Sequence, residues 1–261
     1  MAAPNDEVSR VDHDFALKAF DQQIRQRRRV GDEPVARVLA EAGWAGVTWS
    51  ALTEDNADAA IAGEIERFAA VPGDWEWKYY SYDTPADLPR RLTDAGFVPD
   101  PTETLLVADI ADLDLEVRVP DGIELVPITD AAGADGLVRV HDEVFGGSHA
   151  RIGEAIVERL ETEPDVIPAV LAMAGDRVVC GGRVEYETGT DFASIWGGGT
   201  LPEWRGKGIF RALVAYRAKL AAEAGYRYLQ VDATEDSRPI LQRLGFTVLA
   251  TTTPYMHPGA A

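Results

Sequence analysis

The stretch that decides the fold runs from Ile195 to Arg211 and reads Ile-Trp-Gly-Gly-Gly-Thr-Leu-Pro-Glu-Trp-Arg-Gly-Lys-Gly-Ile-Phe-Arg. A strand leads into Pro202, a basic turn with two glycines follows, and a helix begins near Gly208. Successive backbone N–H groups at the start of a helix attract an anion, and the helix dipole adds to that attraction. Gly206 and Gly208 leave room for a phosphate close to the backbone. We therefore expect this turn to bind a pyrophosphate group.

The charge pattern also indicates an anionic ligand for this turn. The chain carries 25 basic and 44 acidic residues, so its formal net charge is −19 and most of its surface repels nucleic acid and anionic lipid. Trp204–Leu220 departs from this balance because all of its charges are basic: Arg205, Lys207, Arg211, Arg217 and Lys219. We expect this basic window to bind an anion, while the acidic remainder provides solubility or attracts a cationic substrate.

Composition excludes several classes of protein. A hydrophobic share of 46% and a charged share of 26% are ordinary for a globular chain and exclude collagen, coiled coils and disordered chains. No stretch approaches the roughly 18 uninterrupted apolar residues of a membrane span, and Met1–Arg10 has no apolar signal-peptide core. The single cysteine, Cys180, excludes an intrachain disulfide, and we interpret it as a packing residue. We expect a cytoplasmic protein without a metal site.

Hydrophobic periodicity and turn signals predict alternating helices and strands. The expected helices cover residues 15–30, 35–42, 57–70, 89–95, 131–145, 152–160, 208–224 and 239–244. The expected strands cover residues 75–82, 104–108, 123–127, 169–173, 177–186, 192–201, 228–231 and 246–251. The order of these elements predicts an α/β fold with a mixed sheet (α+β).

A weak internal repeat indicates two related units. A strand, a short helix, a Gly-Phe pair and a second strand occur twice along the chain. At one constant offset, Tyr80–Asp83, Leu92, Gly96 and Phe97 align with Leu229–Asp232, Leu241, Gly245 and Phe246. A turn at Val119-Pro120-Asp121-Gly122 separates the copies, so we place two domains at residues 1–118 and 119–261.

Arg205-Gly206-Lys207-Gly208-Ile209-Phe210 resembles the acyl-CoA motif Gln/Arg-x-x-Gly-x-Gly/Ala of the GNAT N-acetyltransferase superfamily. The resemblance covers about residues 123–255, including Leu201-Pro202 before the turn and Ile240–Phe246 near the end. Phe210 departs from the motif, and we expect its ring to point into the core. The N-terminal half resembles a degenerate copy, as in tandem GNAT proteins. It lacks the Arg-x-x-Gly turn, so we expect it to bind no CoA.

The resemblance implies a set of acetyl-CoA contacts in the C-terminal domain. The strand that ends at Gly199, Thr200 and Leu201 would separate from residues 228–231, and its free backbone groups would pair with the pantetheine arm. One backbone N–H there would polarise the thioester carbonyl. The pyrophosphate would lie on Arg205, Gly206, Lys207, Gly208, Ile209, Phe210 and Arg211. An amine would attack the thioester directly, which requires a base for the ammonium and an acid for the thiolate.

The resemblance leaves the acid and the base open. Many relatives have a tyrosine where this chain has Leu241, and we predict that Tyr255 replaces it, with Tyr216 as an alternative. We predict Glu185 as the base, since Glu185 and Glu187 alternate along one strand and face one side. The other candidates for the base are Glu143, His141, His149 and Asp232.

The sequence therefore predicts an acetyl-CoA-dependent N-acetyltransferase. The expected partners are acetyl-CoA and a small amine acceptor, of polyamine or aminoglycoside type given the acidic surface, or a protein N-terminus. We expect no nucleic-acid or membrane partner, and a homodimer is compatible with the sequence. One alternative is a non-catalytic acyl-CoA-binding or sensing protein, which Leu241 and Phe210 favour. A purely structural interaction domain is another.

Overall fold

The computed structural model describes residues 11–41, 44–163 and 169–260, so the Met1–Arg10 segment examined above for a signal peptide lies outside the described residues. The chain packs into two compact units. We call them the C-terminal unit, built mainly from Leu106–Val231 and Ser237–Val248, and the N-terminal unit, built from Asp14–Leu105 with Asp232–Asp236 and the last residues from Leu249.

The C-terminal unit holds a six-stranded part of the sheet in the order β5-β10-β9-β8-β7-β6. Its strands are β5 (Glu103–Asp109), β6 (Glu124–Pro127), β7 (Ala169–Ala174), β8 (Arg177–Tyr186), β9 (Phe192–Thr200) and β10 (Tyr228–Ala233). Its helices are α4 (Ala131–Phe145), α5 (Ala150–Thr162), α6 (Ile209–Glu223) and α7 (Arg238–Arg243), with short 3₁₀ turns at Ile110–Asp112 and Pro202–Trp204. β9 is antiparallel to β8 and parallel to β10, so the sheet is mixed, as predicted.

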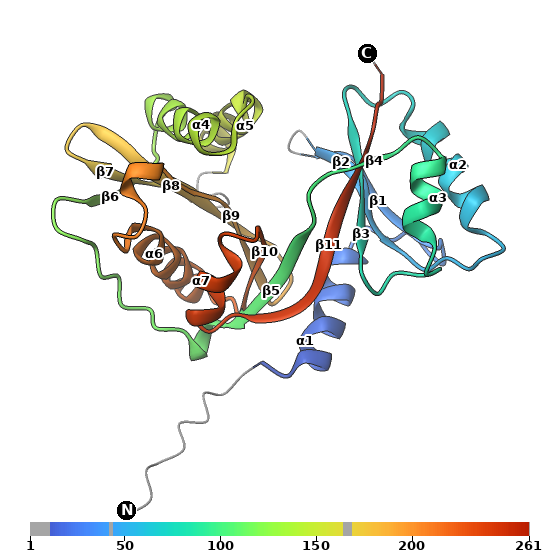
Figure 1. The fold of residues 1–261 in the computed structure, drawn as a ribbon, viewed down its shortest axis with the longest axis horizontal. Coiled ribbons are helices and arrows are strands. Elements are labelled where there is room, and N and C mark those ends of the chain that lie inside the picture. The colour runs from blue at the N-terminus through green and yellow to red at the C-terminus, as the bar shows by residue number, and fades with distance from the viewer. Residues whose placement is uncertain (1–10, 42–43, 164–168, 261) are drawn as a thin grey trace, which may run out of the picture. The chain divides into compact units, whose positions relative to one another are not determined.

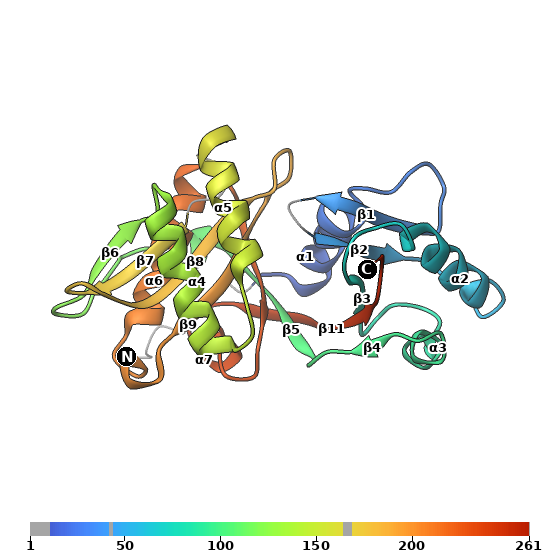
Figure 2. The ribbon, with the colours of Figure 1, turned by 90° about the horizontal axis from the view of Figure 1, so that it is seen from above.

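Strand β7 shows how this unit is layered. Its side chains alternate between two cores, as the pleat of a strand requires. Ala169 and Leu171 join the core under α4 and α5, whereas Val170 and Ala172 join the core under α6. Helices α4 and α5 therefore cover one face of the sheet and α6 covers the other (Figures 1 and 2).

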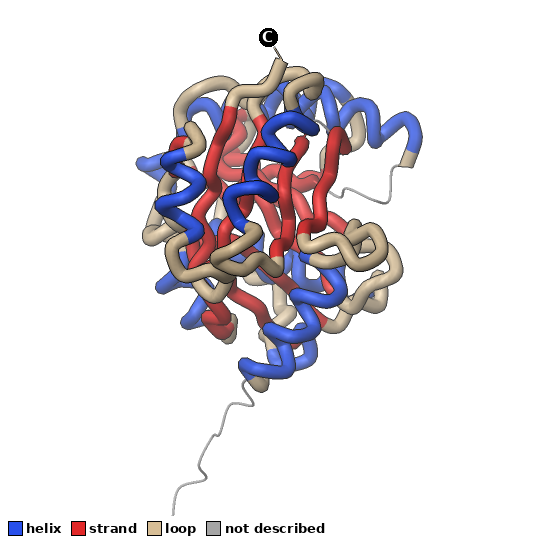
Figure 3. Tube along the Cα trace, turned by 90° about the vertical axis from the view of Figure 1, so that its right-hand side faces the viewer, coloured by secondary structure: helices blue, strands red, loops and turns tan. Residues whose placement is uncertain are grey.

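The N-terminal unit holds the strand order β1-β2-β3-β11, with β4 paired to β11. Its strands are β1 (Val35–Glu41), β2 (Trp44–Ser50), β3 (Trp75–Tyr80), β4 (Val98–Pro99) and β11 (Thr247–His257). Its helices are α1 (His13–Phe20), which runs into a π-helical turn at Asp21–Arg25, α2 (Ala57–Phe68) and α3 (Leu88–Asp94). Residues of α2 and α3 share one core with β3 and β11, so these helices cover one face of these strands (Figure 3).

The predicted helix at residues 35–42 is wrong: this segment contains strand β1, which ends at Glu41. The run Val-Ala-Arg-Val-Leu is compatible with either structure, and pairing with a partner that we did not predict decides between them. That partner is β2, and the antiparallel register joins Val35 to Ser50 and Ala36 to Trp49. Burial of Val35 and Ala36 against the core stabilises the strand.

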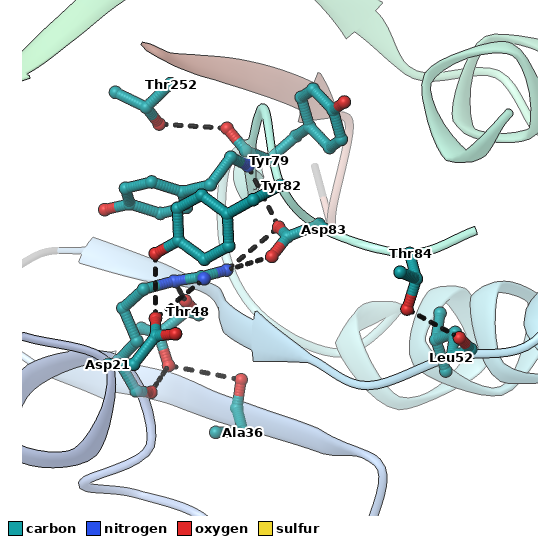
Figure 4. A network of polar contacts seen from close by, with 11 residues as sticks. Asp21, Ala36, Thr48, Leu52, Tyr79, Tyr82, Asp83, Thr84 and Thr252 are labelled. Atoms are coloured by element: carbon teal, nitrogen blue, oxygen red, sulfur yellow. Dashed lines mark hydrogen bonds and ion pairs between the residues drawn. The ribbon is translucent and has the colours of Figure 1, made fainter. Parts of the chain in front are cut away.

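A buried arginine anchors the N-terminal unit. Arg25 is 1% exposed, and its guanidinium donates to both carboxylate oxygens of Asp83, at 2.8 and 2.9 Å, and to Asp21 at 2.9 Å. Tyr82 donates to the same Asp21 oxygen at 2.8 Å, and Figure 4 shows this network. Burial opposes the charge on Arg25, but Asp83 raises its pKa above the ordinary value overall. The cation therefore has its counter-ions in place.

The two copies of the predicted repeat have the same local structure. Helices α3 and α7 each end before a glycine in the left-handed region, Gly96 (φ 97°) and Gly245 (φ 106°). The backbone N–H of the residue after each glycine donates back to the helix. Phe97 donates to the Leu92 carbonyl at 3.0 Å, and Phe246 donates to the Leu241 carbonyl at 3.1 Å. The compact units divide the chain near Leu106 and again within β10 and β11, and the two domains at residues 1–118 and 119–261 stay a prediction from the sequence.

Candidate functional site

Strands β9 and β10 run side by side over only a short distance. Their parallel pairing joins Phe192 to Tyr228, Ala193 to Leu229 and Ser194 to Gln230. From Ile195 to Thr200, β9 pairs on its other side with β8 but no longer with β10. The two strands therefore separate after Ser194, and we call the place where β9 and β10 separate, on the way to Gly199, Thr200 and Leu201, the opening.

The basic turn links β9 to helix α6. A 3₁₀ turn at Pro202–Trp204 leads into it, and α6 begins after Gly208, which adopts a left-handed conformation with φ 86°. A side chain at Gly208 would be strained in this conformation, so glycine is required at the start of the helix. Arg205, Gly206, Lys207 and Gly208 are all exposed. The turn therefore presents its backbone to solvent at the positive end of a 15-residue helix.

The cations of this turn form no ion pair with a carboxylate among the described residues, although Asp114 and Glu203 lie near enough to Arg211 and Lys207 for their charges to interact. Arg205 donates only to the Thr200 carbonyl, at 3.1 Å, and the Lys207 ammonium lies 4.4 Å from the centre of the Trp204 ring. Throughout the described ranges, no carboxylate comes within ion-pair distance of Arg205, Lys207 or Arg211. Three basic side chains without an ion pair therefore surround one helix start, which is an arrangement suited to an anion.

Phe210 turns toward the sheet and away from the exposed turn. Its ring is half-buried and lies against Gly198 of β9, where an added Cβ atom would come within 2.8 Å of the ring. The side chain that departs from the family motif therefore packs on the strand, in keeping with the expected direction.

Three aromatic rings from the α4–α5 corner gather at the opposite face of β9. His141 and Phe145 lie on α4 and His149 precedes α5, and their ring centres are 5.4 to 5.9 Å apart. Phe145 is 49% exposed, and an added Cβ atom on Gly199 would come within 3.1 Å of its ring. This histidine-aromatic cluster therefore borders the stretch of β9 that faces the opening.

His149 is held by a carboxylate. Asp142 lies 2.9 Å from His149 Nδ1 and also accepts the His149 backbone N–H at 2.8 Å. These contacts lower the pKa of Asp142, chiefly through the side-chain hydrogen bond. A carboxylate on Nδ1 fixes the tautomer and leaves Nε2 as a lone-pair acceptor, the arrangement that makes a histidine a base.

The predicted base, Glu185, lies on β8 and is ion-paired. Arg183 Nε donates to Glu185 Oε1 at 2.6 Å, and 30% of the glutamate side chain is exposed. Among the alternatives, Glu187 accepts from Ser194 at 3.4 Å and Glu143 is exposed. Asp232 belongs to the N-terminal unit and is ion-paired to Lys78 at 2.8 Å.

The predicted acid, Tyr255, belongs to the other packed unit from the basic turn. It lies on β11, is 8% exposed, and is part of the core of the N-terminal unit with its ring at right angles to that of Tyr79. Burial raises the pKa of Tyr255. The alternative, Tyr216, is half-buried against the core under α6. Leu241 is fully buried on α7.

Sequence reasoning missed two features of the site, one on α6 and one on β9. Arg217 belongs to the basic window, but the structure buries it to 1% exposure, so it is not available to an anion at the surface. Gly197 has φ 60° and lies where β9 has one residue more than β8 between paired positions. The run of three glycines at 197–199 was the available signal, because a glycine inside a strand often marks a bulge.

The family comparison agrees with this geometry. A sequence model described as the acetyltransferase (GNAT) family matches residues 139–246. This chain contains a GNAT acetyltransferase domain. The matched residues include β9, the basic turn and α6, so the GNAT resemblance of the motif is confirmed. No curated protein matches the chain in sequence.

Solved structures share the fold of the whole chain. A GCN5-related N-acetyltransferase from Kribbella flavida has a TM-score of 0.68 at 20% identity, over 95% of this chain and 96% of its own. A conserved protein of unknown function from Staphylococcus epidermidis has 0.65 at 14%, over 94% and 99%. A tandem GNAT protein from the clavulanic acid biosynthesis pathway has 0.55 at 15%, over 82% and 74%. At these identities the likeness concerns the fold, and it confirms the mixed α/β tandem architecture.

The match to the GNAT acetyltransferase model supports a transferase. In the part of the chain that the structure describes, no helix is both long and apolar enough to cross a bilayer. The same residues contain no group of three or more histidine, cysteine, aspartate and glutamate side chains arranged to hold a metal ion.

Proposed function

We propose that this GNAT protein transfers an acetyl group from acetyl-CoA to the amine of a small acceptor. The observation that carries the proposal is the basic turn at the start of α6, whose cations form no ion pair among the described residues and which directly follows the strand that separates from β10. A nucleotide pyrophosphate matches the charge of the turn, and an extended pantetheine arm matches the edge of β9 that has separated from β10. The acidic surface favours a cationic acceptor, and the single buried cysteine agrees with a cytoplasmic enzyme.

The proposed contacts follow the order of the chain. Gly199, Thr200 and Leu201 would pair with the pantetheine arm through their backbone. Arg205, Lys207 and Arg211 would neutralise the pyrophosphate together with the backbone of Gly206, Gly208, Ile209 and Phe210. The acceptor amine would enter beside the histidine-aromatic cluster and attack the thioester carbon, forming the amide as the C–S bond breaks and the thiolate leaves.

The proposed base is Glu185, and His149 is the second candidate. Arg183 occupies Oε1 of Glu185, so the proton would go to Oε2, whereas Asp142 holds His149 through Nδ1 and the proton would go to Nε2. Tyr255 stays the acid predicted from the sequence; it lies in the core of the N-terminal unit, and burial raises the pKa of its phenol.

We propose one acetyl-CoA site per chain. The loop of the N-terminal unit between β2 and α2, residues 51–56, reads Ala-Leu-Thr-Glu-Asp-Asn and carries two carboxylates and no cation. A helix start of that charge repels a phosphate. Calorimetry with acetyl-CoA should therefore give a stoichiometry of one, and a value of two would show that the N-terminal copy kept its site.

Charge reversal on α6 tests the proposed site. Arg211→Glu places a carboxylate in the turn and should weaken acetyl-CoA binding about 100-fold, because it removes one attraction and adds one repulsion. Lys219→Glu is the matched control, since Lys219 is 55% exposed farther along the same helix, near Glu223. Calorimetry should show near-normal affinity for this control. Equal losses in both variants would mean that only net charge matters.

Two substitutions distinguish the candidate bases once mass spectrometry has identified an acceptor from a panel of amines. Glu185→Gln should lower kcat about 100-fold with little change in acetyl-CoA affinity if Glu185 takes the proton, because a base acts in the transition state. His149→Gln is the matched test of the second candidate. Full activity in Glu185→Gln with loss in His149→Gln would transfer the role to His149. If no amine is acetylated while acetyl-CoA binds, the protein is an acyl-CoA sensor.

A further inference from the structure

Strand β9 contains a bulge at the point where it faces the opening. Gly181 pairs with Gly199 and Arg183 pairs with Trp196, so three steps along β9 match two steps along β8. Gly197, inside the bulge, has φ 60°, a conformation that other residues rarely adopt. A bulge turns peptide groups out of the regular ladder, and such groups need partners outside the sheet.

Two side chains, one from each face of the sheet, lie within hydrogen-bond distance of carbonyls in this bulge. His141 Nε2, from α4, lies 2.7 Å from the Gly197 carbonyl oxygen. Arg217 Nη1, from α6, donates to the Trp196 carbonyl at 3.3 Å and to the Arg183 carbonyl on β8 at 3.2 Å. Neighbouring carbonyls of one strand are therefore held by a histidine on one face and an arginine on the other.

Three glycines make room for the two side chains. An added Cβ atom on Gly197 would come within 2.5 Å of the His141 ring. On Gly182 or Gly198 it would come within 2.9 or 3.2 Å of the Arg217 guanidinium. The side chains and the glycine backbone therefore fit each other closely, and a larger residue at any of these positions would displace them.

Neither Arg217 nor His141 can be explained by a favourable contribution to folding stability. Arg217 is 1% exposed, and among the described residues it has no carboxylate partner; its donors reach only carbonyls, including Leu213 on its own helix. His141 is also 1% exposed, and its Nδ1 has no hydrogen-bond partner. A buried cation without a counter-ion and a buried nitrogen without a partner both cost free energy that an apolar side chain would not.

We propose that His141 and Arg217 are positioning residues that fix the peptide groups of the β9 bulge, so that one backbone N–H of the bulge is aimed at the thioester carbonyl of a bound acyl-CoA. In a trans peptide the C=O and the following N–H point in opposite directions. Holding the Trp196 and Gly197 carbonyls thus fixes the N–H directions of Gly197 and Gly198. A hydrogen bond to a carbonyl also polarises its peptide group and strengthens the N–H as a donor. The inference rests on the proposed acyl-CoA site.

The test compares acetyl-CoA with CoA, which lacks the carbonyl. The infrared stretch of [1-¹³C]acetyl-CoA measures polarisation directly, and calorimetry gives the affinity of each ligand. Wild type should lower the carbonyl frequency relative to water. Arg217→Met and His141→Leu should lose that shift and weaken acetyl-CoA binding about fivefold to tenfold, while CoA affinity stays the same. Arg217→Lys and His141→Gln keep a donor and should retain most of the shift.

Controls separate positioning from general loss of structure. Ile156→Val removes a methyl group from a core of the same unit away from β9 and should leave the carbonyl shift unchanged. If Arg217→Met does not fold, the pair His141→Leu and His141→Gln still decides the question. An unchanged shift in the donor-lacking variants overturns the proposed role while leaving the acetyl-CoA site intact. Failure of wild type to bind acetyl-CoA overturns the proposed function itself.

Discussion

Among the residues that the structure describes, each unit of this protein buries one arginine, and the two are held in opposite ways. Arg25, in the N-terminal unit, is in contact with the carboxylates of Asp83 and Asp21. Arg217, in the C-terminal unit, is equally buried but reaches only backbone carbonyls. Burial lowers the pKa of Arg217 to about 10, so the guanidinium is still charged at neutral pH. Arg217 therefore has carbonyl dipoles in place of counter-ions.

The difference separates a structural role from a functional one. A paired buried ion joins elements of one unit and becomes costly mainly when one partner is removed. An unpaired buried ion costs free energy in the intact protein and is kept where its field or its hydrogen bonds are used. By this criterion Arg25 organises the N-terminal unit, whereas Arg217 serves the bulge of β9 in the unit that carries the GNAT domain.

Removing each cation should give the largest contrast. Arg25→Met leaves the Asp83 carboxylate buried without its counter-ion and should cost about 3–5 kcal/mol of unfolding free energy. Arg217→Met removes an uncompensated charge and should leave stability within about 1 kcal/mol of wild type, or raise it. Urea unfolding of both variants measures the two changes. A loss in Arg217→Met as large as that in Arg25→Met would contradict the functional reading.

A second contrast concerns pH. Burial lowers the pKa of His141 from 6.5 to about 4, so between these values the unfolded chain binds the proton first. His141 should therefore cost about 3 kcal/mol of stability as the pH falls from above 6.5 to below 4. Burial raises the pKa of Glu103, in the N-terminal unit, from 4.5 to about 7. Its effect on stability has the opposite sign. Glu103 contributes about 3 kcal/mol of unfolding free energy below pH 4.5, and this contribution is lost as the pH rises through 7.

The variants His141→Gln and Glu103→Gln isolate these two contributions. The difference in unfolding free energy between wild type and each variant, measured from pH 5 to pH 8, should rise with pH for His141→Gln and fall with pH for Glu103→Gln. Slopes of the same sign would show that one of the two groups is not buried as described.

The smallest contrast concerns two glycines with almost the same backbone angle φ. Gly175 (φ 59°), in the β7–β8 turn, has nothing within 4 Å of an added Cβ atom, whereas Gly197 (φ 60°) would meet His141 at 2.5 Å. Gly175→Ala should cost about 1–2 kcal/mol from the left-handed backbone alone. Gly197→Ala should cost a further 1–3 kcal/mol or so from overlap. Thermal or urea unfolding of the two variants measures the difference. Equal losses of unfolding free energy would mean that the His141 side chain moves aside without cost.

Much of the fold could be predicted because its signals are local. Ala131–Phe145 was predicted as a helix from its apolar spacing and its closing glycines, and α4 has those bounds. The segment at 35–42 could not be assigned in this way, because β1 is fixed by pairing with β2 rather than by its own residues. The last strand, predicted at residues 246–251, was likewise too short, because residues 252–257 of β11 become a strand by pairing with β3.

The sequence by itself determined the GNAT resemblance, the basic turn and the order of elements around it, because a helix start, a glycine and a run of like charges act within a few residues. Only the tertiary structure decided that Arg217 is withdrawn from the basic window and that Tyr255 belongs to the core of the other unit. It also brought His141 to the Gly197 carbonyl, across 56 positions of sequence. Burial and partners far apart in the chain control these side chains, and neither can be read from neighbouring residues.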